Sequence, residues 1–121
     1  MFLTENPVDP TLFPSLRDME TEVVAMCSDV LQGGKEAVGS LTTGGTESIL
    51  LAIKTAKNRA KALNPTQTEF EIIIPYSIHS AFFKACDYFE VKPVVIPLTE
   101  DFKADAKAVE NAITNNTILI A

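Results

Sequence analysis

A run of three adjacent isoleucines, Ile72 to Ile74, constrains the fold more than any other feature of the sequence. β-Branched residues favour extended backbone, and an uninterrupted apolar run suits a strand covered on both faces better than an amphipathic helix. We therefore expect a buried strand at 71–75. Shorter apolar runs at 94–96 and 117–120 predict two further strands.

Helical patterns separate these runs. Apolar residues recur at mostly helical spacing in four segments. These are about 15–32, the segment that starts after Glu47 and ends before Pro65, about 78–89, and about 103–115. Ser15 and Ser77 are candidate N-caps, and Gly33-Gly34 would stop the first helix. Alternating helices and strands imply right-handed crossovers, so we expect an α/β fold with three layers, in which helices cover both faces of a mostly parallel sheet.

Two segments are expected along the chain. Residues 1–14 contain three prolines, which remove backbone donors and restrict the residues before them, so this segment should be an irregular arm. Residues 15–121 should form one domain around a single core. Because that domain would stop on an apolar strand with no helix to cover it, we expect it to be incomplete, truncated at its C-terminal end.

The composition limits the classes of partner. The formal net charge is −6, whereas nucleic acids and anionic lipid surfaces both require a concentrated basic face, so neither is an expected partner. No apolar run approaches the ~18 residues of a membrane span, which predicts a cytoplasmic chain and leaves open an anchor upstream in a parent protein. Cys27 and Cys86 lack CxxC spacing and histidine partners, so we expect buried, inert thiols and no metal site.

A turn of small residues, Thr43-Gly44-Gly45-Thr46-Glu47-Ser48, precedes the second helix. Unpaired amides and the positive end of the macrodipole favour an anion at a helix start, and glycine lets a ligand approach the backbone. A hydroxyl such as that of Thr46 would add a donor. The spacing alone fits a plain turn with Thr43 or Thr46 as the helix cap at least as well, and neither GxGxxG nor GxxxxGK[ST] is present.

His79 is the only histidine in the chain. It follows the expected strand at 71–75, at the carboxyl end where parallel sheets place their ligands. Its ring could stack on a flat heterocycle or carry a proton, and a purely structural role near a helix start is the alternative. Ser77 and Ser80 flank it, but no acid at a recognisable spacing completes a hydrolase triad.

Three groups of residues carry a family resemblance. They are Asn6-Pro7 with Phe13-Pro14-Ser15-Leu16-Arg17, then Thr43 to Leu50, then Ser77-Ile78-His79-Ser80-Ala81-Phe82. As a set they resemble the group II pyridoxal-phosphate decarboxylases, and within them most of all the sphingosine-1-phosphate lyases. The likeness covers nearly the whole chain. One departure is the early proline segment, where these lyases usually have a histidine and this chain reads Pro7-Val8-Asp9-Pro10-Thr11.

The resemblance implies the aspartate-aminotransferase type of large domain, which is pyridoxal-phosphate (PLP) fold type I and works as a homodimer. It implies pyridoxal 5′-phosphate as the cofactor, with Gly45 and Thr46 holding the phosphate and His79 stacking on the pyridine ring. In this family the Schiff-base lysine follows a histidine, and no His-Lys pair occurs here. We therefore expect no catalytic residue in this chain, which by itself should be inactive.

The implied activity is that of a carbon–carbon lyase, to which this fragment would contribute the cofactor contacts. Its small-molecule substrate would be a phosphorylated sphingoid base, split into a fatty aldehyde and phosphoethanolamine. One alternative is an amino-acid decarboxylase of the glutamate or tyrosine type, because the glycine turn and the histidine are common to both. Another is a non-catalytic module that binds a phosphorylated ligand or a partner protein.

Overall fold

The computed structural model describes residues 6, 8, 9 and 11–121. Residues 1–5, 7 and 10, which include part of the predicted arm at 1–14, lie outside the described residues. The chain divides into two compact units, residues 1–43 and 44–121, and each is described by itself.

The described residues of the first unit include one helix, α1 (Pro14–Val30), close to the prediction of 15–32. It begins at Pro14 because the fixed φ of proline suits the first helical position. Phe13 therefore holds the cap position, and the prediction of Ser15 as N-cap is wrong. Later in this unit, the carboxylate of Glu20 accepts a hydrogen bond of 2.7 Å from the backbone N–H of Leu41. This bond ties the returning segment to α1.

The end of α1 shows where the helix stop lies. Gln32, with a φ of 56°, and Gly34, with a φ of 73°, adopt the left-handed conformation. The prediction that Gly33-Gly34 stops the helix is wrong, because Gln32 takes the left-handed position directly after the C-cap Leu31. No residue of α1 is buried within this unit.

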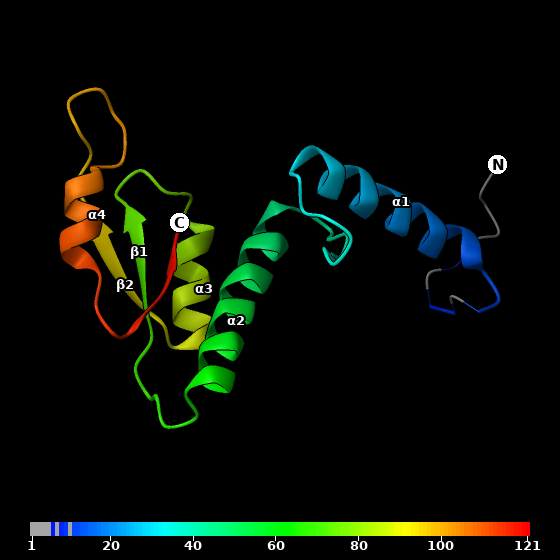
Figure 1. Cartoon of the computed structure of the whole chain (residues 1–121), viewed down its shortest axis with the longest axis horizontal. Helices are drawn as coiled ribbons and strands as arrows, with labels where there is room; N and C mark the ends of the chain where they lie inside the picture. Colours follow the sequence, from blue (N-terminus) through cyan, green and yellow to red (C-terminus); the bar gives the residue numbers. More distant parts are fainter. Residues whose placement is uncertain (1–5, 7, 10) are drawn as a thin grey trace. The chain divides into compact units, whose positions relative to one another are not determined.

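The second unit confirms the predicted alternation of helices and strands (Figure 1). Its elements in chain order are α2 (Gly45–Leu63), β1 (Glu71–Pro75), α3 (Ala81–Phe89), β2 (Lys92–Ile96), α4 (Ala106–Ala112) and β3 (Thr117–Ile120). Strands β1 and β3 have the bounds that their β-branched runs predicted.

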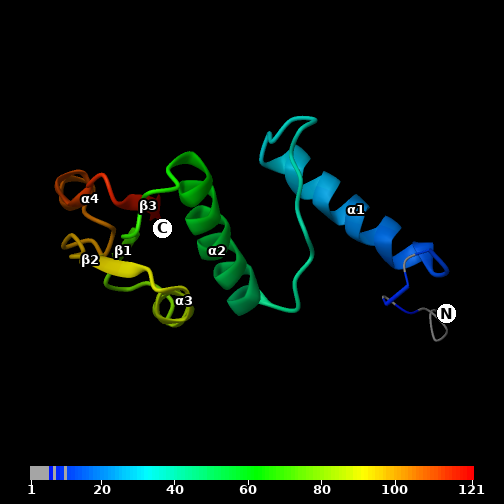
Figure 2. The same cartoon turned by 90° about the horizontal axis from the view of Figure 1, so that it is seen from below.

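The three strands form one parallel sheet in the order β2-β1-β3. The chain leaves β1 for β2 on one side and then crosses back over β1 to reach β3. Right-handed crossovers of opposite direction place their helices on opposite faces of a sheet. Accordingly, Figure 2 shows α2 and α3 on one face and α4 on the other, which confirms the predicted three-layer α/β class.

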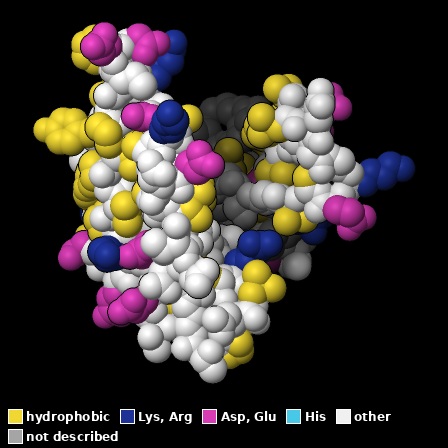
Figure 3. Space-filling view, turned by 60° about the vertical axis from the view of Figure 1, so that its left-hand side comes forward, with side chains coloured by type: hydrophobic (Ala, Val, Ile, Leu, Met, Phe, Trp, Pro, Cys, Tyr) yellow, Lys and Arg dark blue, Asp and Glu magenta, His cyan; other side chains and the backbone are white. Residues whose placement is uncertain are grey.

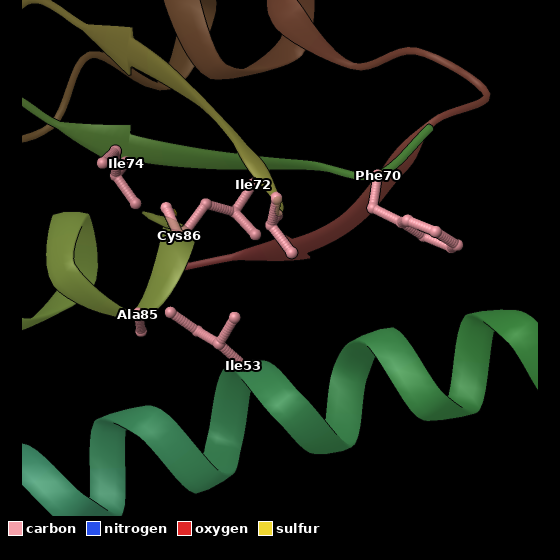
Figure 4. Close-up of a cluster of buried hydrophobic side chains, with 7 residues drawn as sticks. Ile53, Phe70, Ile72, Ile74, Ala85 and Cys86 are labelled. Carbon is pink, nitrogen blue, oxygen red and sulfur yellow. The ribbon is translucent and has the colours of Figure 1, made fainter. Parts of the chain in front are cut away.

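The core lies between the sheet and the pair α2 and α3. Ile72 and Ile74 of β1 point to this side, where they meet Ile53 of α2 with Ala85 and Cys86 of α3 (Figure 4). Ile73 points to the opposite face and is also fully buried. The prediction that this strand is covered on both faces is therefore confirmed.

Glu71 is the one buried charged residue within the described part of the chain. Its carboxylate accepts hydrogen bonds from Lys92 Nζ at 2.8 Å and from Thr114 Oγ1 at 2.7 Å. The Lys92 bond first, then the Thr114 bond, lowers the pKa of Glu71 below its ordinary value. The ionised carboxylate thus links β1 to its neighbour β2 and to the turn that leads into β3.

Two helices start later than their periodicity predicted. Helix α3 begins at Ala81 rather than near residue 78, so Ser77 is not its cap. Helix α4 spans Ala106–Ala112 rather than 103–115, because the side chain of Asp105 caps it by accepting from the backbone N–H groups of Lys107 and Ala108. The residues before Asp105 are used in an isolated bridge between Leu98 and Ala104.

Large apolar side chains reach the surface, as the yellow atoms of Figure 3 show. In the second unit the most exposed of them include Leu63, Tyr76 and Phe102, the last with 84% of its area accessible. Among residues 6, 8, 9 and 11–121, no helix combines the length and the apolar character needed to cross a membrane.

The two cysteines differ, so the prediction of two buried thiols holds for one of them. Cys86 is buried in the core of the second unit, and this burial raises the pKa of its thiol. Cys27 on α1 is exposed, because α1 buries no residue within its own unit.

We expect one thiol equivalent to react rapidly with a disulfide reagent in the folded chain, because only Cys27 is accessible. The second equivalent should appear only when denaturant is added. In a Cys27→Ser variant the rapid phase should be lost, and its persistence would contradict the burial of Cys86.

Candidate cofactor site

The carboxyl end of β1 is the position at which the topology favours a ligand. The strand order reverses around β1, since one connection leads from it to β2 and the next crosses back to β3. In open parallel sheets, ligands bind in the crevice outside the carboxyl ends of the strands where this reversal occurs. The segment that follows β1 at this end contains His79.

Helix α2 begins on the predicted glycine turn. Gly44 holds the cap position and Gly45 is the first helical residue. The first turn of the helix is closed by a bond of 3.2 Å from the backbone N–H of Ser48 to the carbonyl of Gly44. The amides of Gly45 and Thr46 precede this bond, so they are among the N–H groups that a helix leaves without an intrahelical acceptor.

Neither glycine is required by the chain itself. Gly44 has a φ of 165°, which is extended backbone that any residue adopts, and Gly45 is helical. A methyl group built at either position meets no atom within 4 Å. Packing and backbone conformation therefore leave the two glycines unexplained, whereas close approach of a ligand to the backbone would explain them. The turn fits a phosphate group in this respect.

His79 lies between β1 and α3 and is exposed. Its ring Nδ1 accepts a hydrogen bond of 3.1 Å from the backbone N–H of Ala81, the first residue of α3. The ring is thus held by the start of α3 while the chain leaves it uncovered. A flat ring held in this way suits contact with another flat ring.

The starts of α2 and α3 lie at the same end of the second unit. Ile53 packs against Ala85 between the two helices, and both begin at the end toward which β1 points (Figures 1 and 2). This arrangement brings the turn at Gly45 and Thr46 to the same end as His79.

Sequence reasoning missed Ala81, whose backbone N–H holds the imidazole, since no residue type signals such a bond.

Four lysines of this unit lie near aromatic rings, namely Lys54, Lys57, Lys61 and Lys84. Lys54 Nζ lies 5.3 Å from the ring centroid of Phe89, and Lys84 Nζ lies 5.4 Å from that of Tyr88. Such positions are typical of cation–π contacts.

Comparison with solved structures defines the class of the fold. The chain superposes on a sphingosine-1-phosphate lyase from Burkholderia pseudomallei with a TM-score of 0.80, at 35% identity, covering 90% of this chain and 27% of that one. A glutamate decarboxylase from Lactobacillus brevis gives a TM-score of 0.79 at 23% identity, covering 98% of this chain and 29% of that one, which is a likeness of fold. The second unit thus has the architecture of PLP fold type I enzymes.

Sequence comparison with curated proteins identifies homologues of the chain. No protein-family model matches the chain. The sphingosine-1-phosphate lyase of Dictyostelium discoideum is 41% identical over 100% of this chain and 22% of its own length. A protein of Methanothermobacter thermautotrophicus named "Probable L-tyrosine/L-aspartate decarboxylase" is 36% identical over 98% of this chain and 31% of its own. The homologues of the chain are therefore sphingosine-1-phosphate lyases and group II PLP-dependent decarboxylases, of which it spans about a fifth to a third.

Proposed function

We propose that this chain supplies the cofactor-phosphate and ring contacts of a PLP-dependent carbon–carbon lyase of the sphingosine-1-phosphate lyase type. The observation that carries the proposal is the glycine turn at the start of α2, which neither packing nor backbone conformation explains. The identity of 41% to a sphingosine-1-phosphate lyase supports the choice of enzyme class.

Each of the three residues would have a defined task. The backbone N–H groups of Gly45 and Thr46 would donate to the cofactor phosphate, and the dipole of α2 would stabilise its negative charge. The exposed hydroxyl of Thr46 would add a donor. The ring of His79 would lie against the pyridine ring and fix its plane. All three groups bind and orient, and none of them is a nucleophile.

When bound, pyridoxal phosphate supplies an electron-withdrawing pyridinium ring that stabilises the charge left when a bond to the substrate breaks. The proposed substrate of the whole enzyme is a phosphorylated sphingoid base, and the products are a fatty aldehyde and phosphoethanolamine. We further propose, from the family resemblance, that the whole enzyme is a cytoplasmic homodimer. The covalent attachment of the cofactor would come from residues other than those of this chain.

An amino-acid decarboxylase is the second candidate. It is supported by the identity of 36% to the Methanothermobacter thermautotrophicus protein. Both candidates use the cofactor contacts in the same way, so they differ only in the substrate and in the bond that breaks.

A segment exchange tests the choice between them. The chain would replace the matching segment of the Dictyostelium discoideum lyase and, separately, that of the Methanothermobacter thermautotrophicus decarboxylase. Aldehyde release in the first hybrid and carbon dioxide release in the second are each measured relative to the unmodified host. If the chain comes from a lyase, the lyase host should retain the larger fraction of its activity.

The reverse order of retained activity would assign the chain to the decarboxylases. If both hybrids fold and neither is active, the contribution of cofactor contacts is itself contradicted. A matched pair of hybrids with His79→Ala serves as the control, because both should lose cofactor affinity whichever reaction the whole enzyme performs.

A further inference from the structure

The ring of His79 has a structural task in α3. The backbone carbonyl of His79 accepts a hydrogen bond of 3.0 Å from the N–H of Phe82. The ring Nδ1 accepts one of 3.1 Å from the N–H of Ala81. Ser80 holds the N-cap position of α3, and these two bonds satisfy amides of the first turn from the residue before it, as a side-chain cap does. Ser80 itself has helical dihedral angles and makes no side-chain cap bond. His79 therefore satisfies an amide at the helix start.

This bond decides where the ring carries its proton. An imidazole nitrogen can accept a hydrogen bond only through a lone pair, so this bond requires an unprotonated Nδ1 in His79. In a neutral imidazole the single proton is then on the other nitrogen, Nε2. The two nitrogens lie on different sides of the ring, so the Nε2–H group points away from Ala81.

We infer that, in the neutral ring, the start of α3 favours the Nε2–H tautomer of His79, which offers a ligand a hydrogen-bond donor at Nε2 and a flat face. A second proton would have to enter at Nδ1, where it would face the N–H of Ala81. The stacking role considered for the ring is compatible with this bond. Only the identity of the ligand rests on the proposed function.

Nitrogen-15 NMR of the folded 121-residue chain tests the tautomer, because the chain has one histidine. The ring nitrogens are distinguished by their couplings, since Nε2 couples to two ring protons and Nδ1 to one. The spectra are recorded about two pH units above the ordinary imidazole pKa of ~6.5, a pH at which free imidazoles are neutral. We expect the ratio of Nε2–H to Nδ1–H to be roughly fivefold higher than in the urea-unfolded chain, the factor for a cap of about 1 kcal/mol.

An unchanged ratio, or enrichment of the Nδ1–H form on folding, would overturn the inference. A pair of variants gives an independent readout. His79→Asn keeps a side-chain acceptor at the cap, whereas His79→Phe keeps a flat ring without one. Hydrogen exchange at the Ala81 amide should be roughly fivefold faster in the phenylalanine variant and nearly unchanged in the asparagine variant. Equal protection in both variants would mean that no cap exists.

These measurements contain no cofactor. Their outcome does not depend on cofactor binding, so a result that contradicts the tautomer inference does not contradict the proposed phosphate contacts. Should the phenylalanine variant fail to fold, the tautomer ratio of the unmodified chain still decides the question.

Discussion

Replacing Ile53 by alanine is expected to lower the free energy of unfolding of the chain by about 2 to 5 kcal/mol. Ile53 is fully buried and packs against Ala85 and Cys86 of α3 as well as Ile72 and Ile74 of β1, so truncation leaves a cavity where α2, α3 and the sheet meet. Because domains are stable by only about 5–15 kcal/mol, this is a large share of the total. Urea unfolding followed by circular dichroism measures it.

Leu63→Ala is the matched control for this change. It removes the same number of carbon atoms from the same helix, but 72% of Leu63 is exposed. The expected loss is within about 0.5 kcal/mol. Equal losses in the two variants would show that α2 does not depend on its contact with the sheet.

Replacing Gly45 by valine is expected to weaken binding of a phosphorylated ligand while leaving folding nearly unchanged. A Cβ atom at this position meets no atom within 4 Å, so the free energy of unfolding should change by no more than about 0.5 kcal/mol. The same side chain would occupy the space above the amides of Gly45 and Thr46. Loss of one charge-assisted hydrogen bond of about 1.5–3 kcal/mol raises the dissociation constant by roughly 10- to 150-fold.

The control for this variant is Ala52→Val, which introduces the same branched side chain at an exposed position of α2 beyond its first turn. Its dissociation constant should equal that of the unmodified chain. If both variants bind equally well, the start of α2 is not the phosphate site. If Gly45→Val unfolds the chain, the glycine has a structural task.

The sequence allowed the strands to be predicted more closely than the helix boundaries. The run Ile72 to Ile74 predicted a strand buried on both faces, because its side chains must alternate between the faces and every one of them is apolar. Helix starts depend instead on which acceptor satisfies the first amides. Asp105 and His79 supply these acceptors for α4 and α3, and periodicity alone does not identify either of them.

The candidate site was predicted from motifs rather than from periodicity. Gly45 and Thr46 stand at the start of α2 as the glycine turn indicated, and His79 follows β1 as its spacing indicated. Their roles toward the cofactor stay predictions. The cap bond of His79 could not be foreseen, since it depends on the orientation of one imidazole ring. The exposure of Cys27 was missed because residue type alone does not show whether α1 buries a face within its unit.

Nitrogen-15 NMR titration of the chain with 4′-deoxypyridoxine phosphate shows whether Gly45, Thr46 and His79 contact the cofactor. This analogue has the ring and the phosphate of the cofactor but no aldehyde to react with lysines, and 4′-deoxypyridoxine at equal ionic strength shows what the phosphate adds. We expect saturable shifts at the amides of Gly45 and Thr46 and at the ring of His79, which weaken without the phosphate. Saturable shifts confined to other residues, equal responses to both compounds, or no response would contradict these contacts.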